Sequence, residues 1–454
     1  MLAVQSLDQF VFGRAPNPVE LRGGLVLGGG TVVPELNFTL GTVVIDDDTW
    51  PRVLSEYDGM IAAALKRAVE LETPSLVVEF ETLPPMTIRP RWGLEIVRLL
   101  SDRMRACEDR HGIRTALRFT PNDTREFNRP PILRRGEYWD GMLEAFEEAA
   151  AHGADMIAIE STGGKEVCDD ALVNADLDRV VYALGVLGAR DMEFLWNHIV
   201  ASCEKGGIVP AGDTACGFAN TAMVLADKMM IPRVFAAVVR VASVPRSLVA
   251  YTCGAKGPSK DCAYEGPYMK ALAGVPISME GRSAACAHLS PVGNVSQCVC
   301  DCWSNESVQN VQLLSGRAPV VSLEQLIYDC RLMNTAAASS DADARRLRDW
   351  LSESDVVYDP QALVLAPDVV LRIAGRIAAE ETPYLQTRAA VQAAVDEIAE
   401  ARRAGRLRLS DREQKWVGIL QNQAKALPDP EEDFHARVHP TIPPGSYLPA
   451  EYGL

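Results

Sequence analysis

The stretch Ala211-Gly212-Asp213-Thr214-Ala215-Cys216 guides the interpretation of the whole chain. A short apolar run, residues 207–210, leads into it, and a run of helix-forming residues, 219–226, follows it. This order is typical of a strand that ends in a loop and continues into a helix. It places a thiol in the loop.

Two further corners of this kind flank the first. Residues 155–159 form a compact apolar run that ends at Glu160, and residues 247–251 form another whose following loop contains Cys262. If these strands are parallel neighbours, the side chains at their ends meet at one edge of the sheet. We therefore expect Glu160, Cys216 and Cys262 to form a metal site with one vacant position, as a catalytic zinc requires. The alternative for each cysteine is a buried, small apolar residue.

Composition narrows the class of protein. The chain has 454 residues, 48% of them hydrophobic, and a net charge of -16, with a mean hydropathy of -0.01. These values indicate a soluble globular protein, and the acidic balance argues against a nucleic-acid groove or an anionic membrane surface. No apolar run reaches the roughly 18 residues of a membrane helix. Residues 1–12 lack a signal-peptide pattern, so we expect the 11 cysteines to be reduced, in the cytoplasm.

Strand and helix patterns alternate from about residue 58 onward, which favours right-handed βαβ units and a parallel sheet. Because no nucleotide-binding fingerprint is present, we expect a (β/α)8 TIM-type barrel rather than an open sheet. The expected strands are residues 75–81, 114–119, 155–159, 207–210, 248–251 and 276–280. The expected barrel helices are residues 59–72, 92–107, 138–152, 177–187, 191–205 and 219–226.

The pattern divides the chain into three parts. Residues 1–50 are expected to be an N-terminal extension, 51–334 the catalytic barrel, and 335–454 a helical appendage with a Pro-rich wrapping tail. In the appendage, Ser410 and Glu413 have the spacing of a helix capping box. The glycine-rich residues 23–30 lack a phosphate-loop motif, so we expect a hairpin or loop there.

A second thiol cluster is a rival metal site. Cys298, Cys300 and Cys302 alternate, so on a strand all three would face one side. They lack the spacing of zinc ribbons or of radical-enzyme clusters. His288 lies nearby in sequence, and a core or pocket histidine is the expected role.

A series of motifs extends over nearly the whole chain. The motifs are VPELN (33–37), EFET (79–82), WG (92–93), TALR (115–118), GAD (153–155), ESTGGKEV (160–167), AGDT (211–214), NTAM (220–223), PRSLVAY (245–251), GPxKDC (257–262), CDCWSNESV (300–308), YDC (328–330), MNTA (333–336) and EYG (451–453). Together they resemble the zinc-containing subunit of methanol:corrinoid methyltransferase.

The resemblance implies a mechanism and a ligand set. In that family zinc is held by the residues that match Glu160, Cys216 and Cys262, within a (β/α)8 barrel. Methanol binds the open zinc position, and its methyl group is transferred to Co(I) of a corrinoid (cobalamin) carried by a partner protein. Glu81 and Asp213 are candidates for handling the proton of the leaving oxygen, and a structural hydrogen-bonding role is the alternative for each.

The corrinoid is expected to come from another chain. Its binding signature would be Asp-x-His-x-x-Gly, and the partial match at Asp109 and His111 fails because residue 114 is Arg. The expected partners are a corrinoid-binding protein and a small methyl donor, in a homodimer or a hetero-oligomer with the corrinoid subunit. Two other functions remain open: a related zinc barrel that demethylates another O-methyl compound, and a non-catalytic subunit that binds the corrinoid protein.

Overall fold

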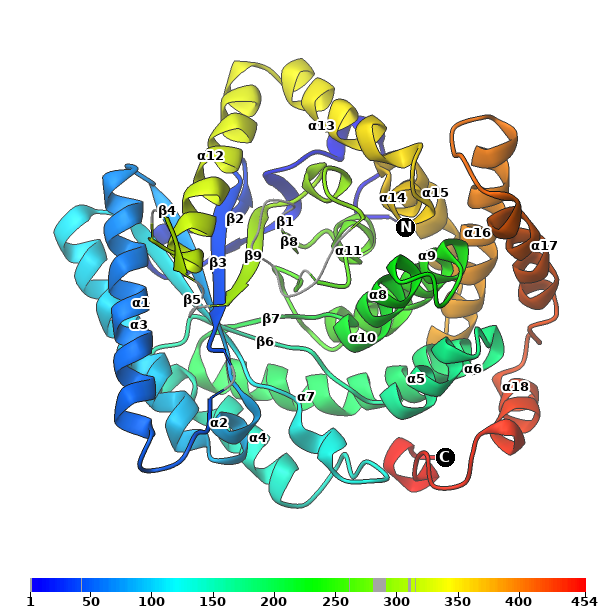
Figure 1. Cartoon of the computed structure of the whole chain (residues 1–454), viewed down its shortest axis with the longest axis horizontal. Coiled ribbons are helices and arrows are strands. Elements are labelled where there is room, and N and C mark those ends of the chain that lie inside the picture. The colour runs from blue at the N-terminus through cyan, green and yellow to red at the C-terminus, as the bar shows by residue number, and fades with distance from the viewer. Residues whose placement is uncertain (1, 42, 261, 281–290, 309–311, 315) are drawn as a thin grey trace.

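Seven parallel strands form one curved sheet in the order β7-β6-β5-β4-β3-β9-β8 (Figure 1). The computed structural model describes residues 2–41, 43–260, 262–280, 291–308, 312–314 and 316–454. The strands are β3 (Val33–Thr39), β4 (Ser75–Glu81), β5 (Arg114–Thr120), β6 (Met156–Ile159), β7 (Val209–Asp213), β8 (Ser278–Glu280) and β9 (Cys302–Val308).

An irregular segment, residues 256–259, closes this sheet into a barrel. The amides of Lys256 and Gly257 donate to the carbonyls of β7 residues Pro210 and Ala211 at 2.7 and 2.8 Å. On its other side the amide of Ser278, in β8, donates to the carbonyl of Ser259 at 3.2 Å. The segment therefore takes the place of a strand between β7 and β8. We call the seven strands and this segment the eight staves of the barrel; they follow one another in chain order, and the segment is the sixth. The expected TIM-type fold is confirmed.

Helices surround the barrel, and most lie between successive strands (Figure 1). They are α1 (Trp50–Glu70), α2 (Pro84–Ile88), α3 (Pro90–His111), α4 (Glu137–Glu148), α5 (Lys165–Val173), α6 (Leu177–Tyr182), α7 (Ala189–Gly206), α8 (Thr221–Asp227), α9 (Arg233–Ala242), α10 (Val244–Thr252), α11 (Gly266–Ala273) and α12 (Ala318–Ser339). The appendage contains α13 (Asp341–Val356), α14 (Pro360–Leu365), α15 (Pro367–Ile377), α16 (Pro383–Arg403), α17 (Asp411–Lys425) and α18 (Glu431–Val438).

Both expected boundaries of the barrel need correction. Strand β3 pairs in parallel with β4 and β9, so the barrel begins at Val33, inside the segment expected to be an extension. Helix α12 packs against β3 and β9, so the barrel continues past residue 334 to Ser339. Strand β3 was missed because a strand with both faces buried lacks the apolar–polar alternation that identifies half-buried strands.

The expected strand at residues 248–251 is wrong, because this run lies in helix α10. Helix α10 and its neighbour α9 both pack against α16 of the appendage. They form one apolar run, Arg233–Thr252, whose length and hydropathy would suit a membrane span, but 89% of its most apolar window is buried inside the protein. A helix that is buried on all sides shows no period, so a short part of it resembles a buried strand.

The barrel interior changes character from one end to the other. A hairpin of β1 (Arg14–Glu20) and β2 (Val26–Gly29) covers the end where the strands begin, as expected for the glycine-rich segment. Its apolar side chains join Val33, Val77 and Met156 of the barrel in one core cluster. Above this layer the interior is charged: Arg118 Nε lies 2.7 Å from Glu35 Oε1, and both side chains are fully buried.

Helix α17 caps its neighbour as well as itself. Ser410 accepts a hydrogen bond from the amide of Glu413 at 3.4 Å, which confirms the expected helix start. The carboxylate of Glu413, however, accepts from the amides of Arg233 and Val234 at 3.1 and 2.9 Å. These are the first two amides of α9, which has no side-chain cap of its own.

We expect Glu413→Ala to destabilise the protein by about 1 kcal/mol, because two amides at the start of α9 lose their acceptor. For a chain of this size the shift in Tm is about 1–2 °C. Glu381→Ala, at an exposed position before α16, is the control and leaves the Tm unchanged. Equal melting of the two variants would contradict the capping role.

Candidate metal centre

Glu160, Cys216 and Cys262 meet at the end of the barrel where the strands finish. Glu160 directly follows β6, Cys216 begins a π-helical turn shortly after β7, and Cys262 follows the sixth stave. Their ligand atoms all lie within 4.8 Å of one another. Cys262 Sγ lies 3.0 Å from Glu160 Oε1. The structure therefore brings together the three residues that the sequence singled out.

This donor set fits a zinc ion. Thiolate sulfur and carboxylate oxygen bind zinc at about 2.3 and 2.0–2.2 Å in a tetrahedral arrangement. Ligand atoms in such a tetrahedron are separated by about 3.5–3.8 Å, so a cluster within 4.8 Å needs only small adjustments. Three protein donors leave a fourth position for a small molecule, as in catalytic zinc sites.

Without a metal ion, the two thiols hold their protons firmly. The pKa of Cys216 is raised to about 12. Its hydrogen bond with Cys262 lowers the pKa, but burial and the carboxylates of Glu160 and Glu280 together raise the pKa by more. Burial, followed by the hydrogen bond with Cys216, also raises the pKa of Cys262 well above its ordinary value. A metal ion at this site would supply the positive charge that thiolates need.

A buried lysine stands among the carboxylates beside the thiols. The Nζ atom of Lys260 lies 2.9 Å from Glu79 Oε1 and 3.4 Å from Glu160 Oε1, and it also forms an ion pair with Glu81. Only 1% of its side chain is exposed. Lys260 lies in the motif that contains Cys262, but this role was not expected from the sequence.

Glu81, the first of the two expected proton-handling residues, lies at the mouth of the barrel with 23% of its side chain exposed. Burial of the carboxyl raises its pKa well above the ordinary value. Lys260 opposes the shift, and the neighbouring carboxylates of Glu160, Glu79 and Glu306 add to it. The electrostatics therefore suit a carboxyl that can carry a proton near the metal position.

Asp213, the second expected residue, occupies a closed network behind the ligands. It accepts from the Ser161 hydroxyl at 2.6 Å and from Trp196 Nε1 at 3.0 Å, and it is fully buried. Arg246 pairs with Asp213 and donates to the Ser161 carbonyl at 2.7 Å. Burial raises the pKa of Asp213, while Arg246 and the hydrogen bonds oppose the shift. These contacts fit the structural role that was the alternative for Asp213, because they fix Ser161, the residue next to Glu160.

Further side chains connect the loops that carry the two cysteines. Glu265 accepts from the amide of Ala215 at 2.8 Å and from the Thr214 hydroxyl at 3.2 Å. The Thr214 hydroxyl in turn accepts from the amide of Ala263 at 3.1 Å. These contacts join residues beside Cys216 to residues beside Cys262. Single-sequence patterns carry no signal for them, because the partners are far apart in the chain.

The rival cysteines do not form a second centre. Among the residues that the structure describes, one group of three potential metal ligands has all its ligand atoms within 4.8 Å of one another, and this group is Glu160, Cys216 and Cys262. Cys302 points into the barrel core, while Cys298 and Cys300 belong to a different core cluster. They do not share one strand face, because β9 begins only at Cys302. His288 and Asp261 lie outside the described residues.

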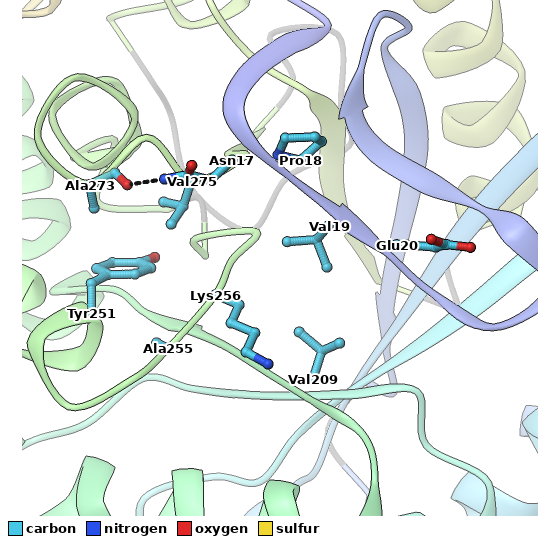
Figure 2. A pocket seen from close by; sticks show the side chains of 10 residues that line it. All are labelled: Asn17, Pro18, Val19, Glu20, Val209, Tyr251, Ala255, Lys256, Ala273 and Val275. Carbon is cyan, nitrogen blue, oxygen red and sulfur yellow. Dashed lines mark hydrogen bonds between the residues drawn. The ribbon is translucent and has the colours of Figure 1, made fainter. Parts of the chain in front are cut away.

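A cleft of about 430 Å³ lies at the opposite end of the barrel (Figure 2). It is bounded by the β1 hairpin strand and by the starts of later staves, including Val209 and Lys256. Its lining residues do not include Glu160, Cys216 or Cys262.

Comparison with known proteins decides the family. A sequence model described as the methanol-cobalamin methyltransferase B subunit matches residues 1–453. The chain belongs to this family. It is 37% identical over 438 residues to the methanol–corrinoid protein co-methyltransferase of Methanosarcina barkeri (strain Fusaro / DSM 804), covering 95% of this chain and 94% of that protein.

A solved structure of the same family has the same fold. This chain superimposes on a chain of the methanol:cobalamin methyltransferase complex MtaBC from Methanosarcina barkeri with a TM-score of 0.94 and 35% identity. The match covers 100% of this chain and 99% of that one. As a B-subunit family member the chain is a methyltransferase, and the group Glu160, Cys216 and Cys262 is its candidate active site.

Gly163, in the loop after Glu160, allows a close approach to Asp191 that can be tested. A Cβ atom on Gly163 would lie 2.3 Å from Asp191 Oδ2 and 2.4 Å from Asp191 Cβ. Asp191 is itself fixed by a buried ion pair with Arg125 at 2.9 Å. We expect Gly163→Ala to displace the loop after Glu160, lowering both the Tm and the zinc content after reconstitution.

Gly418→Ala is the matched control. A Cβ there, within helix α17, meets no atom within 4 Å, so this variant keeps its zinc and gains up to about 1 kcal/mol of helix stability. Full zinc content in Gly163→Ala would show that the loop tolerates the extra carbon. Metal analysis and thermal melting check both variants.

Proposed function

We propose that this chain transfers the methyl group of methanol to the cobalt of a corrinoid carried by a partner protein, using zinc held by Glu160, Cys216 and Cys262. The observation that carries the proposal is the convergence of these three donors from separate loops within 4.8 Å. They converge at the end of the barrel where TIM-barrel active sites lie. The family to which the chain belongs supports the choice of methyl donor and acceptor.

The proposed zinc would act as a Lewis acid that polarises the methanol oxygen and so weakens its bond to the methyl carbon. The three donors together carry three negative charges once the thiols are ionised. These negative charges would make the zinc a weaker Lewis acid. Lys260, which lies against Glu160, offsets part of the charge and so limits this weakening. The buried hydrogen bonds to Ser161 hold Glu160 in the ligand position.

We assign proton handling to Glu81. Its carboxyl lies at the barrel mouth, next to Lys260 and across from Glu160, and its pKa is raised. The oxygen of methanol is a poor leaving group as hydroxide and a better one as water. An acid close to the metal position therefore lowers the barrier to methyl transfer. Protonated Glu81 can donate from its carboxyl oxygen to the departing oxygen.

The corrinoid is proposed to come from a separate protein that docks over the mouth. The similar Methanosarcina barkeri protein was solved within the complex MtaBC. In this chain the partial corrinoid motif at Asp109 and His111 lies in the last turns of α3 rather than at a loop. The reduced thiols that the site requires also fit a cytoplasmic enzyme.

The first test is metal content together with methyl transfer from methanol to cob(I)alamin. We expect about one zinc per chain in the wild type and loss of both zinc and methylcobalamin formation in Cys262→Ser. Cys253→Ser, at a half-buried thiol after α10, is the control and keeps both. Zinc without turnover of methanol would favour another O-methyl donor, and absence of zinc from reconstituted wild type would end the zinc proposal.

Glu81→Gln tests the proton-handling role. The amide is nearly isosteric but cannot donate a carboxyl proton, so we expect kcat to fall about 100-fold while zinc content stays the same. In the wild type, activity should decline as the pH rises through the raised pKa of Glu81, because the protonated form is lost. The variant should lack this decline. A variant with wild-type kcat would exclude Glu81 as the acid.

A further inference from the structure

The loop that carries Glu160 is fixed by side chains from distant parts of the chain. The Ser161 amide donates to Asp213 Oδ1 at 3.2 Å, and the Thr162 amide donates to Asp123 Oδ2 at 2.8 Å. The Gly164 amide donates to the hydroxyl of Tyr452 at 2.9 Å. Each of these amides thus depends on a side chain from another segment, and the last depends on a residue 288 positions away.

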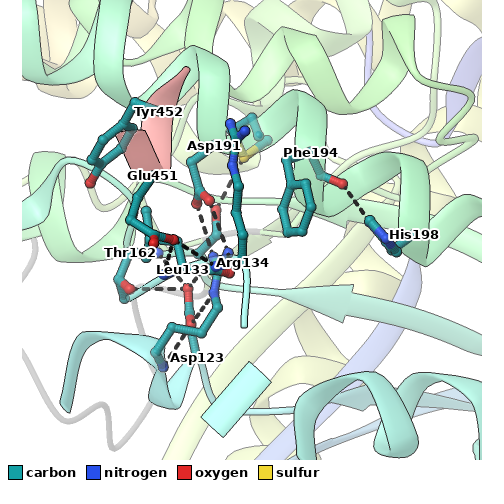
Figure 3. A network of polar contacts seen from close by, with 12 residues as sticks. Asp123, Leu133, Arg134, Thr162, Asp191, Phe194, His198, Glu451 and Tyr452 are labelled. Carbon is teal, nitrogen blue, oxygen red and sulfur yellow. Dashed lines mark hydrogen bonds and ion pairs between the residues drawn. The ribbon is translucent and has the colours of Figure 1, made fainter. Parts of the chain in front are cut away.

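Glu451, beside Tyr452, binds a second segment near the same loop. Its Oε2 atom accepts from the amides of Leu133 and Arg134, both at 3.0 Å, and Oε1 pairs with Arg135 at 2.7 Å. Figure 3 shows Glu451 directed toward Leu133 and Arg134, with Tyr452 beside it. Glu451 and Tyr452 are only 1% and 2% exposed, so this carboxylate and this hydroxyl are buried and matched to specific donors.

A chain of buried contacts continues from Leu133 to the residue after Ser161. The Leu133 carbonyl accepts from Arg125 Nη1 at 3.2 Å. Arg125 forms buried ion pairs with Asp123 at 2.8 Å and with Asp191 at 2.9 Å. Asp123 then accepts from both the amide and the hydroxyl of Thr162 (Figure 3).

Glu451 and Tyr452 therefore support the loop along two routes. Tyr452 contacts it directly at Gly164, and Glu451 acts through Leu133, Arg125 and Asp123. Little space is left for the loop to adjust if a contact is lost on one side, because a Cβ on Gly164 would lie 2.5 Å from the Ala183 carbonyl oxygen. Side chains that orient a metal ligand from behind affect metal affinity even though they do not touch the metal.

We propose that Glu451 and Tyr452 are positioning residues for the metal centre, holding the Glu160 loop in the ligand geometry from the far end of the sequence. This inference rests on the proposed role of Glu160 as a zinc ligand. Loss of the Tyr452 hydroxyl leaves the buried Gly164 amide without an acceptor. The loop then relaxes, and Glu160 spends less time in the ligand position.

Tyr447 provides a matched control in the same segment. Its hydroxyl bonds to Tyr182 at 2.9 Å and to His439 Nδ1 at 2.5 Å, and none of these partners lies in the Glu160 loop. Its ring contacts the Tyr452 ring with centroids 5.7 Å apart. Tyr447→Phe keeps that ring contact and removes a comparable buried hydroxyl, so it reports general destabilisation of the segment.

The test compares Tyr452→Phe and Glu451→Gln with Tyr447→Phe in the full chain. Zinc release to a chromogenic chelator is the first readout. We expect zinc release to be about tenfold faster in Tyr452→Phe than in the wild type. The change in Glu451→Gln should be smaller, because the amide oxygen of Gln can still accept a hydrogen bond. Amide hydrogen exchange of residues 160–164 in metal-free protein is the second, and it should be faster in both variants. Tyr447→Phe should match the wild type in both readouts.

Unchanged zinc release and unchanged exchange in Tyr452→Phe would overturn the proposal. Equal acceleration in Tyr447→Phe would also overturn it, because the effect would then be general destabilisation. If the wild type itself retains no zinc, the proposed function fails, but the exchange comparison still decides whether Tyr452 and Glu451 hold the loop. The two failures are thus distinguishable.

Discussion

A buried ammonium among carboxylates is the interaction on which the centre depends. Lys260 lies within ion-pair distance of Glu79, Glu81 and Glu160. Three carboxylates that converge at the barrel mouth repel one another, and the ammonium offsets part of that repulsion. Removing Lys260 leaves Glu79, which is itself buried, without its partner, and breaking a buried pair of this kind costs about 3–5 kcal/mol. The ammonium therefore allows an acidic pocket with two thiols to exist before any metal binds.

The graded interior of the barrel explains why the chemistry lies at one end. The hairpin of β1 and β2 supplies an apolar plug where the strands begin. A buried pair, Arg118 and Glu35, occupies the next layer, and the acidic cluster with the thiols lies beyond it. Apolar burial stabilises the closed end, while the polar layers occur where loops can supply hydrogen-bond partners. The loops at the strand ends can then carry ligands without weakening the core.

Loops lack the regular ladder that satisfies the backbone of helices and strands, so their polar groups need other partners. Here side chains from distant segments provide them: Arg246 for Ser161, Glu265 for Ala215 and Tyr452 for Gly164. The appendage contributes as well, since Gln361 of α14 accepts from Arg240, which donates to the carbonyl next to Cys262. The helices outside the barrel are thus part of the support of the candidate metal centre.

The sequence by itself determined the alternation of strands and helices, and it identified Glu160 and Cys216, because residues at strand ends of a parallel sheet share one edge. Cys262 was identified from an expected strand that is in fact helical, and the segment 256–259 brings it to the same edge. Tertiary structure alone decided three other features. Residues 248–251 are helical and residues 256–259 form a stave, since buried apolar runs and irregular strands show no period. The hydrogen bonds that surround Asp213 come from Ser161 and Trp196, which lie on other segments of the chain. Lys260 and Tyr452 gained their roles through contacts between residues far apart in the chain, which no local pattern records.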